Sequence, residues 1–272
     1  MTDTPPSSYD DEDDYYSWDD DDSQRPQAEP TTHWSPEQIA QALRDGQPPP
    51  DSSFDRLLPP SLRQVSRQHW TPLHIAVRAA TWLDAVGVSS VVDIGAGPGK
   101  FCVAAALAGN FEITGLEQRP RLLAAARELA RTFAVDDRVS FVQGALGEVA
   151  TPLADAYYLY NPFGENLFGC RERVDEDVEL GRERYDRDVA TIELLLRHAP
   201  VGTYVLTYNG FGGKLPASYR EVRSDSQLPN VLRLCRKVRR NAADSSSERE
   251  AERDADQHAT TRLPLGISSD SQ

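Results

Sequence analysis

The sequence predicts an α/β protein with a seven-stranded, mostly parallel sheet, helices on both faces and a C-terminal antiparallel hairpin. Short runs rich in β-branched residues alternate with helical patterns through the middle of the chain. Such alternation is typical of parallel sheets that are covered on both sides. Two final runs, 218–223 and 231–238, flank a turn at 228–230 and predict the hairpin.

Each element follows from a local pattern, taken in chain order. Residues 35–46 predict a short helix, because Ser35 can cap it and Pro36 suits its first position. A second helix is expected from Thr71, as its cap, to Gly87, with one apolar face. Five strands and three helices then alternate. The strands are expected at 91–94, 111–116, 139–142, 156–160 and 203–207, and the helices at 99–108, 120–134 and 182–198.

Charge and composition divide the 272 residues into four segments. The net charge of −14 lies entirely in the ends, since residues 1–30 carry eleven acids and one Arg, and residues 241–272 carry seven acids and three Arg. We expect a disordered acidic tail over 1–34, a short helix and Pro-rich linker over 35–60, one globular domain over 61–240, and a disordered polar tail from 241 onward. The acidic tail either solubilises the chain or binds a partner.

Several classes of protein are disfavoured by composition. The centre of the chain is neutral, which argues against a nucleic-acid binder held by a basic surface. The longest apolar stretch, around 102–108, is far too short to span a bilayer, and the N-terminus has no apolar secretory segment. The scattered Cys102, Cys170 and Cys235 fit neither a disulfide framework nor a zinc site. We therefore expect a cytoplasmic protein without a metal or a membrane partner.

The most informative segment is a glycine-rich turn after the first central strand, which reads Val-Val-Asp-Ile-Gly-Ala-Gly-Pro-Gly-Lys at residues 91–100. Glycines permit a tight bend and let a ligand approach the backbone closely. A P-loop is excluded, because Ile94 stands where its first Gly belongs and Phe101 follows the Lys. A dinucleotide fingerprint fits poorly, because Lys100 stands where its third Gly belongs.

Gly95, Gly97 and Gly99 after Val-Val-Asp-Ile resemble the first motif of class I S-adenosylmethionine-dependent methyltransferases, which have a Rossmann-like sheet. The resemblance covers roughly residues 70–240 and implies S-adenosyl-L-methionine as the cofactor. It implies that the loop, with Ala96, lies against the methionine part of the cofactor. It also implies that the acid of the strand, here Asp93, helps to hold the loop and the amino group of the cofactor.

The acid after the next strand supports a nucleoside cofactor. In the methyltransferase family such an acid, here Glu117 followed by Gln118, grips both ribose hydroxyls, and a carboxylate accepts such bonds strongly. Nicotinamide enzymes carry a similar acid, so the glycine spacing rather than Glu117 selects the cofactor. One departure is Ala145, which stands where an acid often touches adenine. The backbone of Ala145 and Leu146, or Gln143, is expected to hold adenine instead.

The tip of the fourth strand is expected to carry the methyl acceptor. Ligands bind beyond the carboxyl ends of strands in open α/β sheets, so Asn161-Pro162-Phe163 should face the same crevice as the glycine loop. The tripeptide resembles the Asp/Asn-Pro-Pro-Tyr/Phe motif of amino-group methyltransferases, in which the first residue and the next backbone carbonyl hold the target nitrogen. One Pro stands here instead of two, which favours a protein or small-molecule amine over a nucleic-acid base. The alternative is a simple turn.

Other candidate residues carry weaker signals. Tyr160 and Glu165 flank the tripeptide and could orient or deprotonate an acceptor, or pack in the core. His69 could fold over the cofactor or simply be a packed or solvated side chain. A group of arginines alternates with acids and predicts either a solvated helix with i,i+4 pairs or a lid over the acceptor. These are Arg171, Arg173, Arg182, Arg184 and Arg187.

The sequence thus predicts an S-adenosylmethionine-dependent methyltransferase whose domain spans 61–240 and whose acceptor is an unidentified amine. Two other functions stay open at this point. One is a nicotinamide-dependent oxidoreductase, since the acid after the second strand suits both cofactors. The other is a non-catalytic module that keeps the fold and binds partners through its acidic tail.

Overall fold

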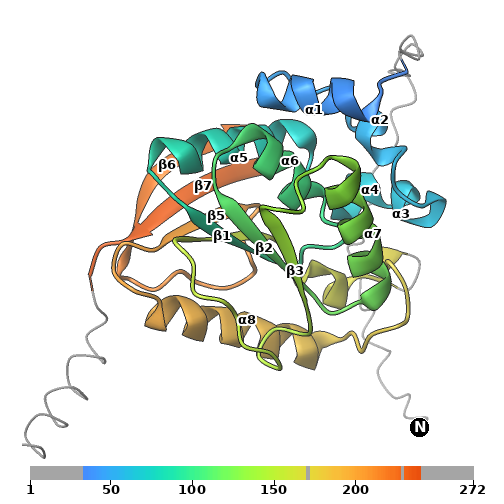
Figure 1. Cartoon of the computed structure of the whole chain (residues 1–272). Coiled ribbons are helices and arrows are strands. Elements are labelled where there is room, and N and C mark those ends of the chain that lie inside the picture. Colours follow the sequence, from blue (N-terminus) through green and yellow to red (C-terminus); the bar gives the residue numbers. More distant parts are fainter. Residues whose placement is uncertain (1–32, 170–171, 228–229, 240–272) are drawn as a thin grey trace, which may run out of the picture. The chain divides into compact units, whose positions relative to one another are not determined.

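The computed structural model describes residues 33–169, 172–227 and 230–239 (Figure 1). Residues 1–32 of the tail expected over 1–34, the tail expected from 241 onward, Cys170 and Arg171, and residues 228–229 of the expected turn lie outside these ranges. The described residues from Trp34 onward belong to one compact unit. Within the described part, no helix combines the length and the apolar composition needed to cross a bilayer.

The described residues form a seven-stranded sheet in the order β3-β2-β1-β4-β5-β7-β6. The first five strands are parallel, and β7 is antiparallel to both β5 and β6. The fold class predicted from the sequence is confirmed. The strands are β1 Ser90–Ile94, β2 Glu112–Glu117, β3 Val139–Gln143, β4 Ala156–Tyr160, β5 Tyr204–Tyr208, β6 Tyr219–Gln227 and β7 Asn230–Lys237. The order reverses between β1 and β4, and such a reversal opens a crevice at the carboxyl ends of the strands.

One face of the sheet carries three helices, α5 Leu73–Ala85, α6 Lys100–Ala108 and α7 Pro120–Thr132. Their apolar residues join alternate strand residues, such as Val91 and Tyr158, in the larger hydrophobic cluster. The helix expected from Thr71 begins instead after Pro72, which occupies the N-cap position without a side-chain bond. The hydroxyl of Thr71 bonds the Tyr158 hydroxyl at 2.9 Å, so it ties the start of α5 to the sheet.

The opposite face is covered differently. The strand residues that alternate with these, such as Val92 and Tyr157, point to the opposite face. They form a smaller hydrophobic cluster with Ile192 and Leu196 of α8 Arg182–His198. Figure 1 shows α8 across the sheet from α5 and α6. The chain runs from β3 to β4 through residues 144–155, and from β5 to β6 through 209–218, without forming a helix in either connection. Among the residues that the structure describes, this face is therefore covered by α8, by loops and by the short 3₁₀ turn Gly164–Leu167.

The described residues before α5 form four helices, of which the sequence predicted only the first. The first, α1 Pro36–Arg44, begins with the expected Ser35 cap, which forms a capping box with Gln38. Three more follow, α2 Asp51–Asp55, α3 Pro60–Gln64 and α4 Ser66–His69. Proline suggested a linker, but here Pro50 and Pro60 occupy helix N-terminal positions, where a missing N–H costs nothing.

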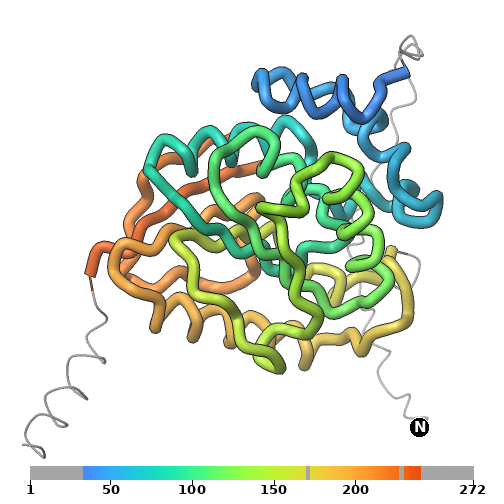
Figure 2. The backbone as a smooth tube through the Cα atoms, in the orientation of Figure 1, coloured from blue at the N-terminus to red at the C-terminus, as the bar shows by residue number. Residues whose placement is uncertain are grey.

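These N-terminal helices pack against the domain and are not a linker. Their fully buried Ile39, Leu43 and Phe54 belong to the same hydrophobic cluster as α6, and Figure 2 traces the segment next to the helical face of the sheet. The ring of Phe54 stacks on that of Phe133 with centroids 5.1 Å apart. The Lys100 ammonium, at the start of α6, then anchors α2 and α4. It lies 2.6 Å from Asp51 and 2.8 Å from Asp55, and it donates to Ser66 at 3.3 Å.

Candidate functional site

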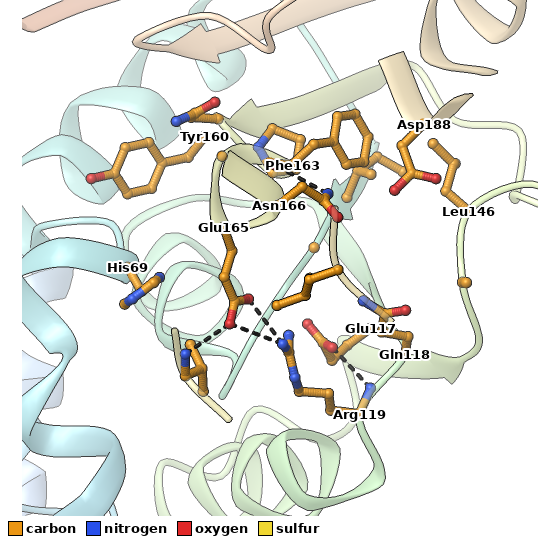
Figure 3. A pocket seen from close by; sticks show the side chains of 18 of the residues that line it. His69, Glu117, Gln118, Arg119, Leu146, Tyr160, Phe163, Glu165, Asn166 and Asp188 are labelled. Carbon is orange, nitrogen blue, oxygen red and sulfur yellow. Dashed lines mark hydrogen bonds and ion pairs between the residues drawn. The ribbon is translucent and has the colours of Figure 1, made fainter. Parts of the chain in front are cut away.

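A cavity opens at the carboxyl ends of β1, β2 and β4, at the point where the strand order reverses (Figure 3). Its free volume, open mouth included, is about 1080 Å³. Most of the residues expected to hold the cofactor or the acceptor line it. They are Gly95, Glu117, Gln118, Ala145, Leu146, Asn161, Pro162 and Phe163.

The glycine turn owes its shape to backbone conformations that side chains disfavour. Gly95, Gly97 and Gly99 have φ values of 78°, 57° and 76°. Space is also short, because a Cβ on Gly97 would lie 2.7 Å from the Trp70 ring, and one on Gly95 would lie 3.1 Å from Pro162 Cβ. Gly95 faces the cavity, whereas Gly97 and Gly99 do not line it. The last two glycines therefore shape the turn rather than contact the cavity.

Glu117 lies at the tip of β2 as expected, with 6% of its surface exposed. Its Oε2 accepts the Gly97 N–H at 3.0 Å, and its Oε1 accepts the Arg119 N–H at 2.9 Å. Burial raises the pKa of Glu117, while the hydrogen bond and the charge of Arg119 lower it. A carboxylate offers about four acceptor positions, so each oxygen can accept a further bond from a ligand hydroxyl.

Asp93 lies behind the turn, next to the main cavity. It lines a smaller cavity with Gly95, Tyr158 and Tyr160. The thiol of Cys102 donates to its Oδ2 at 3.2 Å, so the bond shown goes to α6 and not to the loop that Asp93 was expected to hold. Burial raises the pKa of Asp93 to about 7, although the Cys102 bond lowers it. The carboxyl is therefore poised between its charged and neutral forms near neutral pH.

The end of the cavity under β3 is lined by Gly144, Ala145 and Leu146, as expected for the adenine end. Gln143, the other expected adenine contact, does not line it. Helix α8 adds Arg184 and Asp188 to this end. The Arg184 Nε lies 2.8–2.9 Å from both oxygens of Asp188, and both side chains are largely buried. This pair differs from the exposed Arg182–Asp186 pair on the same helix, so the expectation of a fully solvated helix face is wrong at Arg184.

The tip of β4 forms a tight turn at Asn161. Its φ of 37° is unusual for a side-chain-bearing residue, and Asn tolerates it better than most. The Asn161 N–H donates to Gly210 O at 2.9 Å, and its carbonyl accepts the Gly164 N–H at 3.0 Å. The carboxamide is exposed, and with Pro162 and Phe163 it lines the cavity near the glycine turn.

Aromatic side chains surround this part of the cavity. The His69 ring lies 5.6 Å from that of Trp70 and 5.7 Å from that of Phe168, between centroids. The rings of Tyr160 and Tyr208 are 4.8 Å apart. Burial lowers the pKa of His69, and its Nε2 lies 2.9 Å from the Glu172 carbonyl. All except Tyr208 line the cavity, which gives it an aromatic wall next to Asn161.

An ion cluster that the sequence did not reveal crosses the cavity. The guanidinium of Arg119, 5% exposed, lies 2.9 Å from Glu165 (Figure 3). It also lies 2.8 Å from Asp175. Glu165 also accepts the Val174 N–H at 2.7 Å. The Glu165 carboxylate, considered from the sequence as a base for the acceptor, is therefore engaged by these two donors. The cluster joins the β2–α7 turn to the segment after β4, a link between residues about 50 positions apart.

Comparison with known families agrees with this geometry. Residues 88–158, from β1 to β4, match the family of methyltransferase domains. This segment of the chain is thus similar to a methyltransferase domain. The resemblance predicted from the glycine turn is thereby confirmed, and S-adenosylmethionine is the cofactor of class I methyltransferases. The match covers the glycine turn and Glu117 and ends just before Asn161.

One curated relative and several solved structures resemble the methyltransferase domain. The ribosomal protein L11 methyltransferase of Methylococcus capsulatus is 38% identical over 96 residues, 34% of this chain and 33% of the relative, so the chain spans about a third of that relative's length. A Salinibacter ruber RNA methyltransferase in complex with S-adenosyl-L-homocysteine is 20% identical, with 63% and 95% of the two chains covered and a TM-score of 0.46. A Bacillus cereus O-methyltransferase is 11% identical, with 73% and 97% covered and a TM-score of 0.47.

Proposed function

We propose that the protein transfers a methyl group from S-adenosylmethionine to the nitrogen of a protein or small-molecule amine. One observation carries the proposal: the glycine turn, Glu117 and Asn161-Pro162-Phe163 line one cavity at the reversal point of the sheet. This arrangement would put a cofactor and an acceptor side by side. The family match supports the cofactor half, and the turn at Asn161 supports the acceptor half.

The residues at the first two strand tips suit a nucleoside cofactor with a charged amino-acid end. Glu117 keeps acceptor positions for two vicinal hydroxyls, and bonds to a carboxylate are stronger than neutral ones. The Gly95–Ala96 backbone can lie against a ligand, since Gly95 has no side chain to block the approach. Asp93, next to that backbone, suits an ammonium group. When bound, S-adenosylmethionine supplies an electrophilic methyl on a sulfonium centre.

The tip of β4 suits the acceptor. The Asn161 carboxamide oxygen and the Pro162 carbonyl can both accept hydrogen bonds from an amine, which would direct its lone pair toward the cofactor. Alignment of two reactants can contribute several kcal/mol, up to roughly 7–11 in favourable cases. A protonated amine has no lone pair, and a desolvated site disfavours the charged form. The aromatic wall of His69, Trp70 and Phe168 would provide such surroundings.

Proteins are the first acceptors to test. The curated relative is a ribosomal protein L11 methyltransferase, and its similarity covers 96 residues. A single Pro in the acceptor motif also argues against a nucleic-acid base. The alternative functions are an oxidoreductase that binds a nicotinamide cofactor, and a module that binds S-adenosylmethionine without transferring its methyl group.

Two measurements test the proposal. Isothermal titration calorimetry of the full chain should show binding of S-adenosylhomocysteine and none of NAD at the same concentrations. Tritiated S-adenosylmethionine and a cell lysate, fractionated into protein, RNA and metabolites, should then give label in protein or in small amines. An Asn161→Gly variant tests the acceptor half, because it should bind the cofactor as the wild type does but transfer little tritiated methyl group. Binding of NAD alone, or label that never exceeds a protein-free blank, would contradict the proposal.

A further inference from the structure

We propose that Asp188, on α8, recognises the exocyclic amino group of the cofactor's adenine, in place of the acid that is missing after β3. The inference rests on the proposed function, since it concerns the cofactor of that reaction. It assigns the recognition to a side chain that comes about 45 residues after the strand from which an acid was expected. The chain between β3 and β5, which includes α8, explains how Asp188 reaches the cavity.

The way the second face of the sheet is covered brings α8 to the adenine end. The connection from β3 to β4, residues 144–155, forms no helix, so no helix of its own covers the tip of β3. Helix α8 takes that position. A Cβ on Gly147 would lie 3.3 Å from Thr191 of α8, and Arg184 reaches Gln118 at the tip of β2. The helix therefore contacts the ends of both strands that flank the adenine end.

Asp188 is the carboxylate that this placement presents to the cavity. Only 5% of its surface is exposed, and it lines the cavity with Ala145 and Leu146. Figure 3 shows its side chain near Leu146, across the cavity from Glu165. The Ala145 side chain is a methyl group, so it leaves room where a larger acid would otherwise stand. An acid on the facing helix can occupy the same end of the cavity.

Arg184 holds Asp188 in place without using all its capacity. The Nε of Arg184 donates to both oxygens, at 2.9 and 2.8 Å, and the Nη2 of the same guanidinium donates to the Gln118 oxygen at 3.3 Å. A carboxylate offers about four acceptor positions, so at least two remain. A buried carboxylate only accepts hydrogen bonds, and it therefore selects a base edge that presents an N–H donor.

The competing explanation is that Asp188 only stabilises α8 through its i,i+4 pair with Arg184. The two explanations differ in one respect. A purely structural Asp188 would not affect which base the site prefers, whereas a carboxylate that faces the base favours an amino group over an oxo group. In S-inosylhomocysteine an oxo group replaces this amino group and N1 gains a hydrogen, so a carboxylate that faces the 6-position meets an acceptor instead of a donor. Binding of either ligand can be measured without a methyl acceptor and without turnover.

The experiment compares the dissociation constants of these two ligands by calorimetry. The wild-type chain should bind S-adenosylhomocysteine at least roughly 30-fold more tightly than the inosine analogue, because an unpaired buried acceptor faces the oxo group. In Asp188→Ala the ratio should fall to about threefold or less. Asp186→Ala is the matched control, since Asp186 lies on the same helix, pairs with Arg182 and is 64% exposed. Its ratio should equal that of the wild type.

Asp188→Asn provides a second variant of nearly the same shape. Its amide can turn a donor toward an oxo group, so the inosine analogue should gain affinity while thermal unfolding confirms the fold. A ratio in Asp188→Ala or Asp188→Asn equal to that of the wild type would overturn the inference and leave Asp188 with a purely structural role. A wild-type chain that binds both ligands equally would overturn it as well. A wild-type chain that binds neither would instead overturn the proposed function.

Discussion

The turn after β1 and the turn after β4 meet in one cavity but are built in different ways. The first is set by backbone conformation, since three glycines with positive φ bend the chain and leave Gly95 open to the cavity. The second is set by side chains that arrive from several segments, such as His69 before α5 and Phe168 after β4. A turn encoded in its own residues can be identified from sequence, whereas a wall assembled from distant segments depends on the tertiary fold.

Each turn is also supported by an ion cluster, and the two clusters differ in their relation to the cavity. Lys100, with Asp51 and Asp55, lies behind the glycine turn and does not line the main cavity. Arg119, with Glu165, lines it and ties the segment after β4 to β2. The first cluster is expected to act on stability alone, and the second on the shape of the acceptor end. Variants in each turn can separate these roles.

The largest effect is expected from Lys100→Met. Removing one partner of a buried ion pair leaves an uncompensated charge, at a cost of about 3–5 kcal/mol in the free energy of unfolding. Lys100 is 2% exposed and its partner Asp55 is 9% exposed at the side chain. Urea unfolding measures the loss. The control is Arg131→Met, because the exposed Arg131–Glu128 pair should contribute less than about 1 kcal/mol. Equal losses in the two variants would show that the cluster does not anchor α2.

Glu117→Ala should weaken the cofactor end next. It removes a charge-assisted acceptor and leaves the Gly97 N–H without its partner, which should cost roughly 1.5–3 kcal/mol, or about 10- to 150-fold in affinity for S-adenosylhomocysteine. Calorimetry measures the dissociation constant. Glu112→Ala, at the exposed start of the same strand, is the control and should bind normally. An unchanged constant in Glu117→Ala would remove Glu117 from the cofactor site.

Asn161→Gly tests the acceptor end by itself. Alanine would be strained at a φ of 37°, whereas glycine keeps the turn and removes only the carboxamide. We expect single-turnover methyl transfer to slow by about 10- to 100-fold, as for a lost bond of 1.4–2.8 kcal/mol in the transition state, with cofactor affinity unchanged. Asn161→Asp keeps an acceptor oxygen and should lose less. Full activity in Asn161→Gly would refute the acceptor role, and a parallel loss of cofactor affinity would favour a structural one.

The predicted residues that line the cavity were placed there by local features of the sequence. Gly95 and Glu117 stand at strand ends that the hydrophobic pattern already predicted, and their positions follow from the topology of a parallel sheet. The strand bounds also agree to within a few residues. The same reasoning predicted that Ala145 and Leu146 contact the cofactor, and the structure has both residues in the lining of the cavity.

The residues that it missed depend on packing between distant segments. Arg119 carries no motif, and its partners Glu165 and Asp175 lie about 50 positions later. Asp188 looked like one more acid on a charged helix, because nothing local shows that the neighbouring connection lacks a helix. The three short helices between α1 and α5 were not predicted, since helices of four or five residues have too few turns for an apolar period.

The smallest effect, and the one most specific to the glycine turn, is a pH dependence that Asp93 should impose on cofactor binding. Burial raises the pKa of this carboxyl to about 7, so the cofactor-free protein holds it mostly neutral below that pH. An ammonium group favours the carboxylate, and binding below pH 7 must therefore release a proton. Affinity for S-adenosylhomocysteine should fall by about tenfold between pH 8 and pH 6. Stability of the cofactor-free protein changes in the opposite direction, because the unfolded carboxyl ionises near pH 4 and stability drops as pH rises from about 4 to 7.

Asp93→Asn separates this effect from the other acids. The amide cannot ionise, so both the slope of affinity between pH 6 and pH 8 and the loss of stability between pH 4 and pH 7 should flatten. Asp155→Asn is the control, since Asp155 lies before β4 at the far end of the strands, and hydrogen bonds from Ser89 lower the pKa of its carboxyl. Calorimetry at four pH values measures the first slope and thermal unfolding the second. A slope that survives in Asp93→Asn would assign the titration to another group, such as Glu117, whose pKa burial also raises. The ammonium contact would then belong to the backbone of the glycine turn rather than to its acid.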